Sequence, residues 1–487
     1  MTHRRLPSLL VLSLLVPIAA YIYYHYMATI TKPSAAIVVG SGLAGLSAAF
    51  QLVSHGVPVR ILDRAAKPGG NSIKASSGIN GAPTRFQSVS DNTFLDDTIR
   101  SAGPAFANAR EQREKLVSTL VDRSPSAIYW LNDERGIDLS VVAQLGGHTV
   151  PRTHRPAKST VGASIVMTLL NALKENPLFQ LETEARVTRV LKSGGRVTGV
   201  EYSLKDETKE LYGPVVFASG GFAGDANGML ATYRPDLAGY PSTNDPREGT
   251  QSLLTDVGAQ LLDMEMVQVH PTGFVDPKAP ASPLKFLAAE ILRGEGGVLL
   301  MEGKRFVNEM ETRQHITNAI TKHKPEEGEV KQWDVEVVLD EGTYNAAQTH
   351  LGFYLWKGLM RKTTAAELGA DVIPSLQEYA DAALGRSPDR FGRAAFGHWT
   401  LDKVEPDSVL YIGKVTPVVH FTMGGVIISE KSEVLDGEGK AIPGLWAAGE
   451  VTGGIHGENR LGGSSLLECV VFGRIAGDQA AEAYKGV

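Results

Sequence analysis

The chain has 487 residues, a formal net charge of −6 and a single cysteine, Cys469. This length can bury a large core and is enough for two or three domains. The acidic balance argues against a nucleic-acid partner, which would need a dense basic face. One cysteine excludes an internal disulfide, a Cys-rich zinc site, a Cys-ligated iron–sulfur cluster and a CxxCH haem attachment. We therefore expect no metal site, and any redox chemistry has to come from an organic cofactor.

The N-terminal residues 1–34 form an apolar segment that is separate from the rest of the chain. Arg4 and Arg5 precede the uncharged stretch Leu6–Tyr24, whose length is close to the ~20 residues that span a bilayer. This pattern is typical of a signal-anchor or a cleaved signal peptide. Positive charge ahead of the apolar stretch favours a cytosolic N-terminus and a lumenal chain. We predict the secretory pathway, lumen-facing or membrane-anchored in the endoplasmic reticulum, with the mitochondrion as the alternative.

A strand–turn–helix–strand unit begins directly after this segment. Ala35–Val39 is a short β-branched run that predicts a buried strand. The turn Gly40–Gly45 has the pattern GxGxxG and leads into a predicted helix over 46–55, and a second strand over 57–62 ends at Asp63. Such a unit is typical of a parallel, dinucleotide-binding sheet.

The residues of this turn have distinct tasks in binding a dinucleotide. Gly40 and Gly42 let the backbone turn tightly and approach a pyrophosphate, and Gly45 lets the helix pack on the strand. Asp63 can accept hydrogen bonds from the hydroxyls of an adenosine ribose. The sequence has no second strand followed by GxGxxG, which a permanent NADH site of the usual build would need.

Two further segments favour FAD over NAD. Residues 69–78 are mostly small and polar and can thread along a flavin, and the predicted strand over 445–448 is followed by Glu450, an acid placed to hold the ribityl chain. The residues predicted to bind FAD are Gly40, Ser41, Gly42, Ala44, Gly45, Asp63, Arg64, Gly70, Asn71, Ser72, Ser76, Ser77, Gly78, Val187, Ser219, Gly220, Glu450, Ser464, Ser465 and Leu466.

The rest of the chain alternates between helical and strand patterns. Residues 163–174 and 366–384 are predicted to be helices, and 215–218 and 335–339 to be buried strands, like 445–448. No internal repeat is present. The alternation predicts an α/β fold.

Five stretches carry a resemblance to a known family: 69–81, 268–273, 288–294, 420–425 and 449–463. They resemble the soluble fumarate reductases of the flavoprotein family that includes succinate dehydrogenase and L-aspartate oxidase. Within it the chain is most similar, from about residue 35 onward, to the fungal single-chain enzymes. The resemblance implies a Rossmann-like FAD-binding domain, 35–264 and 416–487, with an inserted α+β capping domain, 265–415. It also implies noncovalent FAD, because the histidine that carries covalent FAD in the succinate dehydrogenase branch is replaced by Ile73.

The resemblance also implies a site for a small dicarboxylate such as fumarate. The residues that match the substrate-binding positions are His270, His420, Arg460, Thr422 and Gly463. A guanidinium such as that of Arg460 can bind a carboxylate with two parallel hydrogen bonds. A lone histidine in an apolar run is usually a core residue, and only the motifs around His270 and His420 favour a substrate role.

Three residues match the family's catalytic positions: Arg313 as the proton donor to carbon, with Glu290 and Arg293 as its relay. Glu290 and Arg293 stand three residues apart and share one face of a helical turn. An arginine is an unusual acid because its pKa lies above ~12. The resemblance implies that Arg313 gives its proton to a carbanion-like carbon and is reprotonated through the other two. The alternative is a buried ion-pair network that only holds the cap.

The sequence departs from the family pattern at three places. Ala289 stands where bacterial relatives often carry threonine, Gln314 follows Arg313 in place of aspartate, and residues 247–250 replace a Thr-Gly-Asp-Gly turn. The first change removes a hydroxyl group that could bind the substrate.

The expected activity is therefore the reduction of fumarate to succinate by hydride transfer from reduced FAD. A diffusible reduced flavin or NADH would supply the electrons. A related enzyme, such as L-aspartate oxidase or a reductase of another unsaturated acid, is the first alternative. A noncatalytic flavoprotein or membrane-tethered redox carrier is the second.

Overall fold

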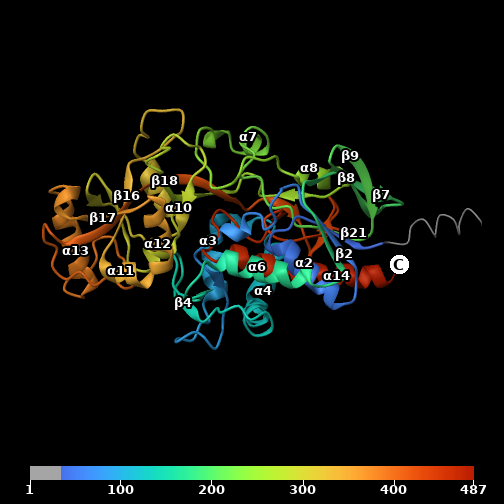
Figure 1. Cartoon of the computed structure of the whole chain (residues 1–487), viewed down its shortest axis with the longest axis horizontal. Helices are drawn as coiled ribbons and strands as arrows, with labels where there is room; N and C mark the ends of the chain where they lie inside the picture. The colour runs from blue at the N-terminus through green and yellow to red at the C-terminus, as the bar shows by residue number, and fades with distance from the viewer. Residues whose placement is uncertain (1–33, 487) are drawn as a thin grey trace, which may run out of the picture.

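The computed structural model describes residues 34–486 (Figure 1). The predicted signal or anchor segment, Leu6–Tyr24, lies outside these residues. Within 34–486, no helix combines the length and the apolar character needed to cross a membrane.

A six-stranded sheet forms the first core of the molecule. Its order is β20–β21–β10–β1–β2–β6, and all neighbouring strands are parallel except β20, which runs antiparallel to β21. Its strands are β1 (Ala36–Val39), β2 (Val59–Leu62), β6 (Phe179–Glu182), β10 (Val215–Phe217), β20 (Glu433–Leu435) and β21 (Ala441–Ala447). Every residue of β1 is buried, as its β-branched run predicts.

Helix α2 (Leu43–Ser54) connects β1 to β2, which confirms the predicted strand–turn–helix–strand unit. The helix begins at Leu43, earlier than predicted, because its first turn is built from the glycine-rich sequence itself. The C-terminal helix α14 (Ser464–Lys485) packs along α2 (Figure 1). Gly473 permits this close approach, since a Cβ there would lie 2.5 Å from the carbonyl oxygen of Ala44.

A second sheet of seven antiparallel strands lies at the opposite end of the molecule (yellow to orange in Figure 1). Its strands are β12 (Val267–Phe274), β13 (Phe286–Leu287), β14 (Val298–Met301), β15 (Lys304–Arg305), β16 (Val335–Leu339), β17 (Arg361–Thr364) and β18 (Val409–Thr422). The central strand β18 pairs with β12, β16 and β17. The predicted domain boundary at 415/416 falls inside this strand, and the domain limits remain a prediction.

Three small sheets and the remaining helices pack around these two main sheets. The sheets are β3 (Ile79–Asn80), β4 (Val141–Ala143) and β5 (Thr153–Arg155); β7 (Ala185–Ser193), β8 (Arg196–Leu204) and β9 (Glu207–Tyr212); and β11 (Leu261–Leu262), β19 (Gly425–Ile427) and β22 (Thr452–Gly453). The helices are α3 (Phe94–Ala102), α4 (Arg110–Asp122), α5 (Ser124–Tyr129), α6 (Val161–Lys174), α7 (Met229–Tyr233), α8 (Gln251–Thr255), α9 (Ile291–Gly294), α10 (Arg313–Thr321), α11 (Glu341–Ala346), α12 (Gln348–Lys357) and α13 (Val372–Ala383).

The architecture confirms the predicted α/β fold class, and one predicted element is wrong. The helix expected over 366–384 is a short 3₁₀ turn, Ala366–Leu368, followed by a break and then α13. Gly369 makes the break with φ +110°, a conformation outside the helical region that glycine adopts without a Cβ clash. The predicted strands over 215–218, 335–339 and 445–448 correspond to β10, β16 and β21.

Candidate active site

One large cavity of about 1050 Å³ lies between the parallel sheet and the antiparallel sheet. Its volume is at the upper end of the ~300–1,000 Å³ usual for ligand pockets. The predicted site residues that line it are Gly40, Ser41, Gly42, Ala44, Asp63, Arg64, Gly70, Asn71, Ser72, Ser76, Ser77, Gly78, Val187, Ser219, Gly220, Glu450, Ser465, Leu466, Gly463, Arg313, His420 and Arg460. The FAD set and part of the substrate set therefore share one cavity.

Six predicted residues do not line the cavity, and four of these, Glu290, Thr422, His270 and Gly45, lie directly behind lining residues. Glu290 contacts Arg313, Thr422 contacts Glu450, and the ring of His270 lies against that of His420. The others are Gly45, which packs on Gly40, Ser464, which binds Asn80, and Arg293, which lies behind Glu290.

The glycine-rich turn forms the end of the cavity that fits a pyrophosphate. Gly40 has φ +104°, and a Cβ there would lie 2.4 Å from the carbonyl oxygen of Ala218. Gly42 is the N-cap of α2 and makes no side-chain cap, and its backbone and the first residues of the helix line the cavity. Such a helix N-terminus attracts anions.

Side-chain hydrogen bonds hold this turn in place. Asp63 accepts a hydrogen bond from the N–H of Ser41 at 2.8 Å, and the Ser41 hydroxyl also donates to it. The Ser41 hydroxyl oxygen accepts from the Gly69 N–H at 3.0 Å, and the Ser72 hydroxyl oxygen accepts from the Leu43 N–H at 3.1 Å. The 69–78 segment is thus tied to the turn, and these residues fit an FAD pyrophosphate and ribose.

Glu450 follows β21 and lines the cavity. Its Oε1 accepts hydrogen bonds from the Thr422 N–H at 3.0 Å and from the Thr422 hydroxyl at 3.2 Å. Burial raises the pKa of Glu450 to about 7. The hydroxyl of Thr422 is therefore directed at Glu450, and its contact with substrate remains a prediction.

Two histidines, the buried His270 and the cavity-lining His420, lie side by side at the substrate end. The ring centroids of His270 and His420 are 5.3 Å apart. Nδ1 of His270 accepts from the Thr272 N–H at 3.2 Å, so Nε2 carries the proton and has no partner among the described residues. Burial, and then the charge of Arg313, lowers the pKa of both rings well below the ordinary value. Both histidines are therefore neutral, and the Nε2–H of His270 is a hydrogen-bond donor.

Arg460 is the cation beside these rings. It is only 3% exposed, and its guanidinium carbon lies 4.4 Å from the ring centroid of Phe421. Its Nε has no hydrogen-bond partner within residues 34–486. Burial and the neighbouring Arg313 lower the pKa of Arg460, which means that an anion bound here would relieve an unfavourable positive charge.

Arg313 begins α10 and connects the cavity to a buried carboxylate. Its Nε donates to Oε2 of Glu290 at 2.7 Å, and its Nη2 donates to the same oxygen. Oε1 of Glu290 lies 3.7 Å from Nη2 of Arg293. Burial alone would raise the pKa of Glu290, but Arg313 and Arg293 outweigh it and hold the pKa at about 2. The three predicted catalytic groups therefore form one charged chain, and Arg313 is the member that faces the cavity.

Two further contacts of this chain are absent from the predicted set. Gln268 accepts from Nη1 of Arg313 at 2.7 Å and donates to the carbonyl oxygen of Arg460 at 3.1 Å, which links the two arginines. The N–H of Gly146 donates to Oε1 of Glu290 at 2.9 Å. Gln268 could have been found, because it lies two residues before His270 and side chains of a strand alternate with period two. Gly146 had no comparable local signal.

The three departures from the family pattern have simple consequences. Ala289 is buried and offers only its N–H, which donates to the Tyr354 hydroxyl at 3.2 Å. Gln314 is turned along α10 and donates to Asn318 at 2.8 Å. Residues 247–250 line the cavity, so this altered turn still contributes to the cofactor site.

Sequence similarity to known proteins identifies the family. A family model described as "FAD binding domain" matches residues 35–466. Fumarate reductase 1 of Saccharomyces cerevisiae is 43% identical, over 92% of this chain and 98% of that protein. The chain belongs to the fumarate reductase/succinate dehydrogenase flavoprotein family. Fumarate reductase of Schizosaccharomyces pombe is 42% identical, over 92% of this chain and 89% of that one.

A solved structure within the family has the same fold. The open conformation of a flavocytochrome c3 fumarate reductase superimposes with a TM-score of 0.71 and 32% identity, over 95% of this chain and 81% of that one. The family, the fold and the FAD cofactor predicted from the sequence are confirmed. The chain is an FAD-dependent oxidoreductase of the class that acts on CH–CH groups.

The raised pKa of Glu450 predicts that FAD affinity depends on pH. A ribityl hydroxyl that donates to Glu450 favours the carboxylate, so the apoprotein should bind FAD best above pH 7. As the pH falls through about 7, affinity should drop, by at most about tenfold per pH unit. Quenching of FAD fluorescence by apoprotein between pH 5.5 and 8.5 measures this. Glu450→Gln should abolish the dependence, and an equal slope in both proteins would contradict the contact.

Proposed function

We propose that the protein reduces fumarate to succinate with electrons from noncovalently bound FAD. The observation that carries this proposal is Arg313, which faces the cavity beside two neutral histidines and is backed by a buried carboxylate. The fumarate reductases of two yeasts, similar over nearly the whole chain, support it.

Charge balance favours a dianion as the substrate. Arg313 and Arg460 line the cavity and present two guanidinium groups to it. These two positive charges match the two carboxylates of fumarate. In a site of low dielectric this match contributes more than it would in water.

Three side chains are placed to hold the carboxylates. Nε of Arg460 is a buried donor without a partner among the described residues, which a bound carboxylate would satisfy, and Nε2 of His270 is a second such donor directly behind His420. His420 lines the cavity, and the Thr243 hydroxyl, 2.9 Å from its Nδ1, holds the ring in place. Binding at these points fixes the alkene and polarises it toward one carboxylate.

Reduced FAD would supply the hydride to one alkene carbon, and Arg313 would deliver the proton to the other. Donation to a carbanion-like carbon suits a guanidinium, because that carbon is a far stronger base than water. Glu290 accepts from two nitrogens of Arg313 and can return a proton, and Arg293 lies on its far side. Because Glu290 is ionised, it can first accept a proton from Arg293 and then pass that proton to Arg313.

We propose further that a diffusible reduced flavin is the electron donor, with NADH as the alternative. Phe286 and Phe353 line the cavity, are each 43% exposed, and have ring centroids 6.4 Å apart. Exposed aromatic faces at a cavity rim suit a planar donor ring.

We also propose that residues 1–34 direct the chain to the secretory pathway, with a membrane tether if the segment is retained. The support is the uncharged stretch Leu6–Tyr24 behind two arginines.

The activity is tested by an anaerobic half-reaction. Purified protein is reduced, fumarate is added, and the return of flavin absorbance is followed by stopped flow. We expect rapid reoxidation in the wild type and a rate lower by about 10²- to 10⁴-fold in Arg313→Gln, because a positioned general acid contributes that much. Both proteins should retain FAD.

Controls separate the alternatives. Arg361→Gln removes an exposed guanidinium far from the cavity and should leave the rate unchanged. Absence of fumarate-dependent reoxidation in the wild type would reject the proposed function. Oxygen consumption with aspartate would instead favour an oxidase, and reoxidation only by another unsaturated acid would redefine the substrate. A normal rate in Arg313→Gln would reject Arg313 as the donor.

The donor is tested by the opposite half-reaction. Oxidised protein is mixed anaerobically with reduced FMN or with NADH, and we expect faster reduction by the flavin. Phe353→Ala should slow that step by about 2- to 10-fold, the size of one aromatic contact, without changing reoxidation by fumarate. Tyr212→Ala, on the remote strand β9, is the matched control. Equal or faster reduction by NADH would make NADH the donor.

Location is tested with a C-terminal tag on the full chain and on a chain that lacks residues 2–34. The tag of the full chain should be protected from protease in intact microsomes and become accessible after detergent. The shortened chain should remain in the cytosol. Co-sedimentation of the full chain with mitochondria would replace the secretory assignment.

A further inference from the structure

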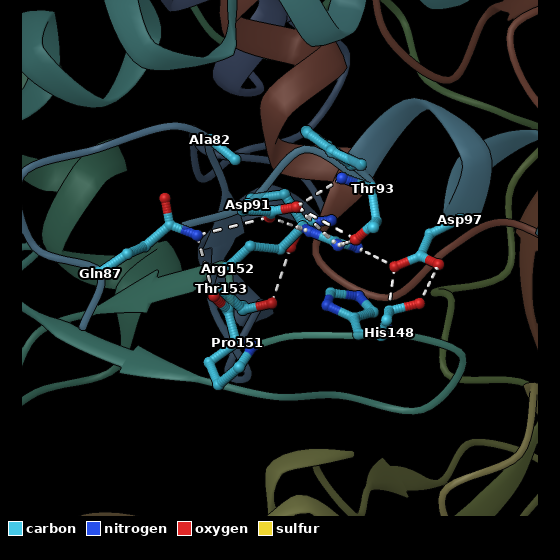
Figure 2. Close-up of polar contacts among 12 residues, drawn as sticks. Ala82, Gln87, Asp91, Thr93, Asp97, His148, Pro151, Arg152 and Thr153 are labelled. Atoms are coloured by element: carbon cyan, nitrogen blue, oxygen red, sulfur yellow. Dashed lines mark hydrogen bonds and ion pairs between the residues drawn. The ribbon is translucent and has the colours of Figure 1, made fainter. Parts of the chain in front are cut away.

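A buried ionic cluster lies outside the cavity, between β5 and the segment that leads into α3. Figure 2 shows Arg152 between Asp91 and Asp97. Its Nε and Nη2 donate to the two carboxylate oxygens of Asp91 at 2.6 and 3.1 Å, and its Nη1 donates to Oδ2 of Asp97 at 2.6 Å. All three side chains are 0% exposed. Buried charged side chains that are joined by several hydrogen bonds are held in one geometry.

The cluster extends to one end of the loop 145–149. Asp97 accepts from the N–H of Thr149 at 2.8 Å and from its hydroxyl at 2.6 Å. Thr149 is itself exposed, and Asp97 is the buried group that anchors it, with weaker contacts from Arg100 to the Thr149 hydroxyl at 3.3 Å and to the carbonyl oxygen of Gly147 at 3.2 Å. Asp97 also lies in the first turn of α3, where a carboxylate is favoured by the free N–H groups of the helix. Burial would raise the pKa of Asp97, but the bonds from Thr149 and Arg152 outweigh it and lower the pKa, so it stays ionised.

The other side of the same loop holds the catalytic carboxylate. The Gly146 N–H donates to Oε1 of Glu290, and the Gly147 N–H donates to the carbonyl oxygen of Met310 at 2.9 Å. A Cβ on Gly146 would lie 2.9 Å from Oε1 of Glu290, and a Cβ on Gly462 would lie 3.0 Å from Oε2. The loop backbone therefore forms one wall against which Glu290 rests.

His148 connects the loop to the segment that bears Arg460. Burial lowers the pKa of His148 to about 4, so the ring is neutral, and its Nε2–H donates to the carbonyl oxygen of Gly462 at 3.0 Å. That oxygen also accepts from Nδ2 of Asn80 at 2.7 Å. The loop thus touches Glu290, Gly462 and the cluster at once.

We propose that Arg152 and Asp97 are positioning residues for proton delivery, which act by fixing the loop 145–149 so that Gly146 orients Glu290 toward Arg313. The proposal rests on the proposed function, because it assigns a purpose to the orientation of Glu290. Neither residue lines the cavity. Their substitution should change the chemical step and leave the binding of FAD and fumarate intact.

Two variants of graded strength test this. Asp97→Asn keeps the shape of the side chain and removes the negative charge that Arg152, Arg100 and Thr149 contact. Thr149→Val removes one exposed hydroxyl and keeps the N–H bond, so folding should be unaffected. Thr198→Val, in the remote strand β8, removes a hydroxyl that donates to Leu191 at 3.4 Å and is the matched control. FAD content, melting temperature, KM, kcat and the solvent deuterium isotope effect are measured for each.

We expect kcat to fall by about 10- to 100-fold in Asp97→Asn, since small displacements of a positioned group cost up to that much. Thr149→Val should show a smaller fall of the same kind. KM and FAD content should stay within about twofold of wild type, and the solvent isotope effect should rise because proton delivery becomes more rate-limiting. Thr198→Val should match wild type in every measurement.

The outcomes separate this proposal from the proposed function. Wild-type reoxidation by fumarate measures the function, and the ratio of variant to wild type measures the positioning role. Unchanged kcat and isotope effect in both variants, with an active wild type, would overturn the positioning role alone. A loss that follows FAD content or melting temperature, with no change in isotope effect, would show a purely structural cluster and would also overturn it. An inactive wild type would overturn both.

Discussion

The substrate end of the cavity depends on the buried carboxylate of Glu290. It accepts from Arg313 and Gly146 and lies between Arg313 and Arg293, with its pKa held at about 2. Without this charge the neighbouring guanidiniums would repel one another in a region that water does not screen. Glu290 therefore allows several cations to converge on a small volume. Two of these guanidiniums, those of Arg313 and Arg460, line the cavity and suit an anionic ligand.

The antiparallel sheet and the parallel sheet meet at the cavity, and one continuous strand links them there. Strand β18 begins in the antiparallel sheet and ends at Thr422, beside the parallel sheet, so that one strand carries His420 into the cavity. Gln268, on the neighbouring strand β12, binds both Arg313 and the backbone of Arg460. A single network of hydrogen bonds thus sets the distance between the proposed proton donor and the proposed carboxylate clamp.

Much of the cofactor site could be predicted from the sequence, because its signals are local. A strand, a glycine turn, a helix and Asp63 follow one another within thirty residues, and the backbone restrictions on Gly40 and Gly42 act inside that stretch. The prediction of one helix over 366–384 was wrong for a local reason too. The hydrophobic pattern continues across Gly369, where the backbone breaks the helix. The roles of the substrate residues came from family resemblance.

The sequence by itself determined the family, the α/β fold and an FAD site, because pattern, glycine conformation and motif context act over short distances. Only the tertiary structure decided which loop and which buried ion pair hold Glu290 in place. Gly146 lies 144 residues away from it in sequence, and the Arg152–Asp97 pair that fixes the Gly146 loop spans 55 residues. Which buried charges meet depends on how distant parts of the chain pack around the cavity. A local sequence pattern carries no information about that packing.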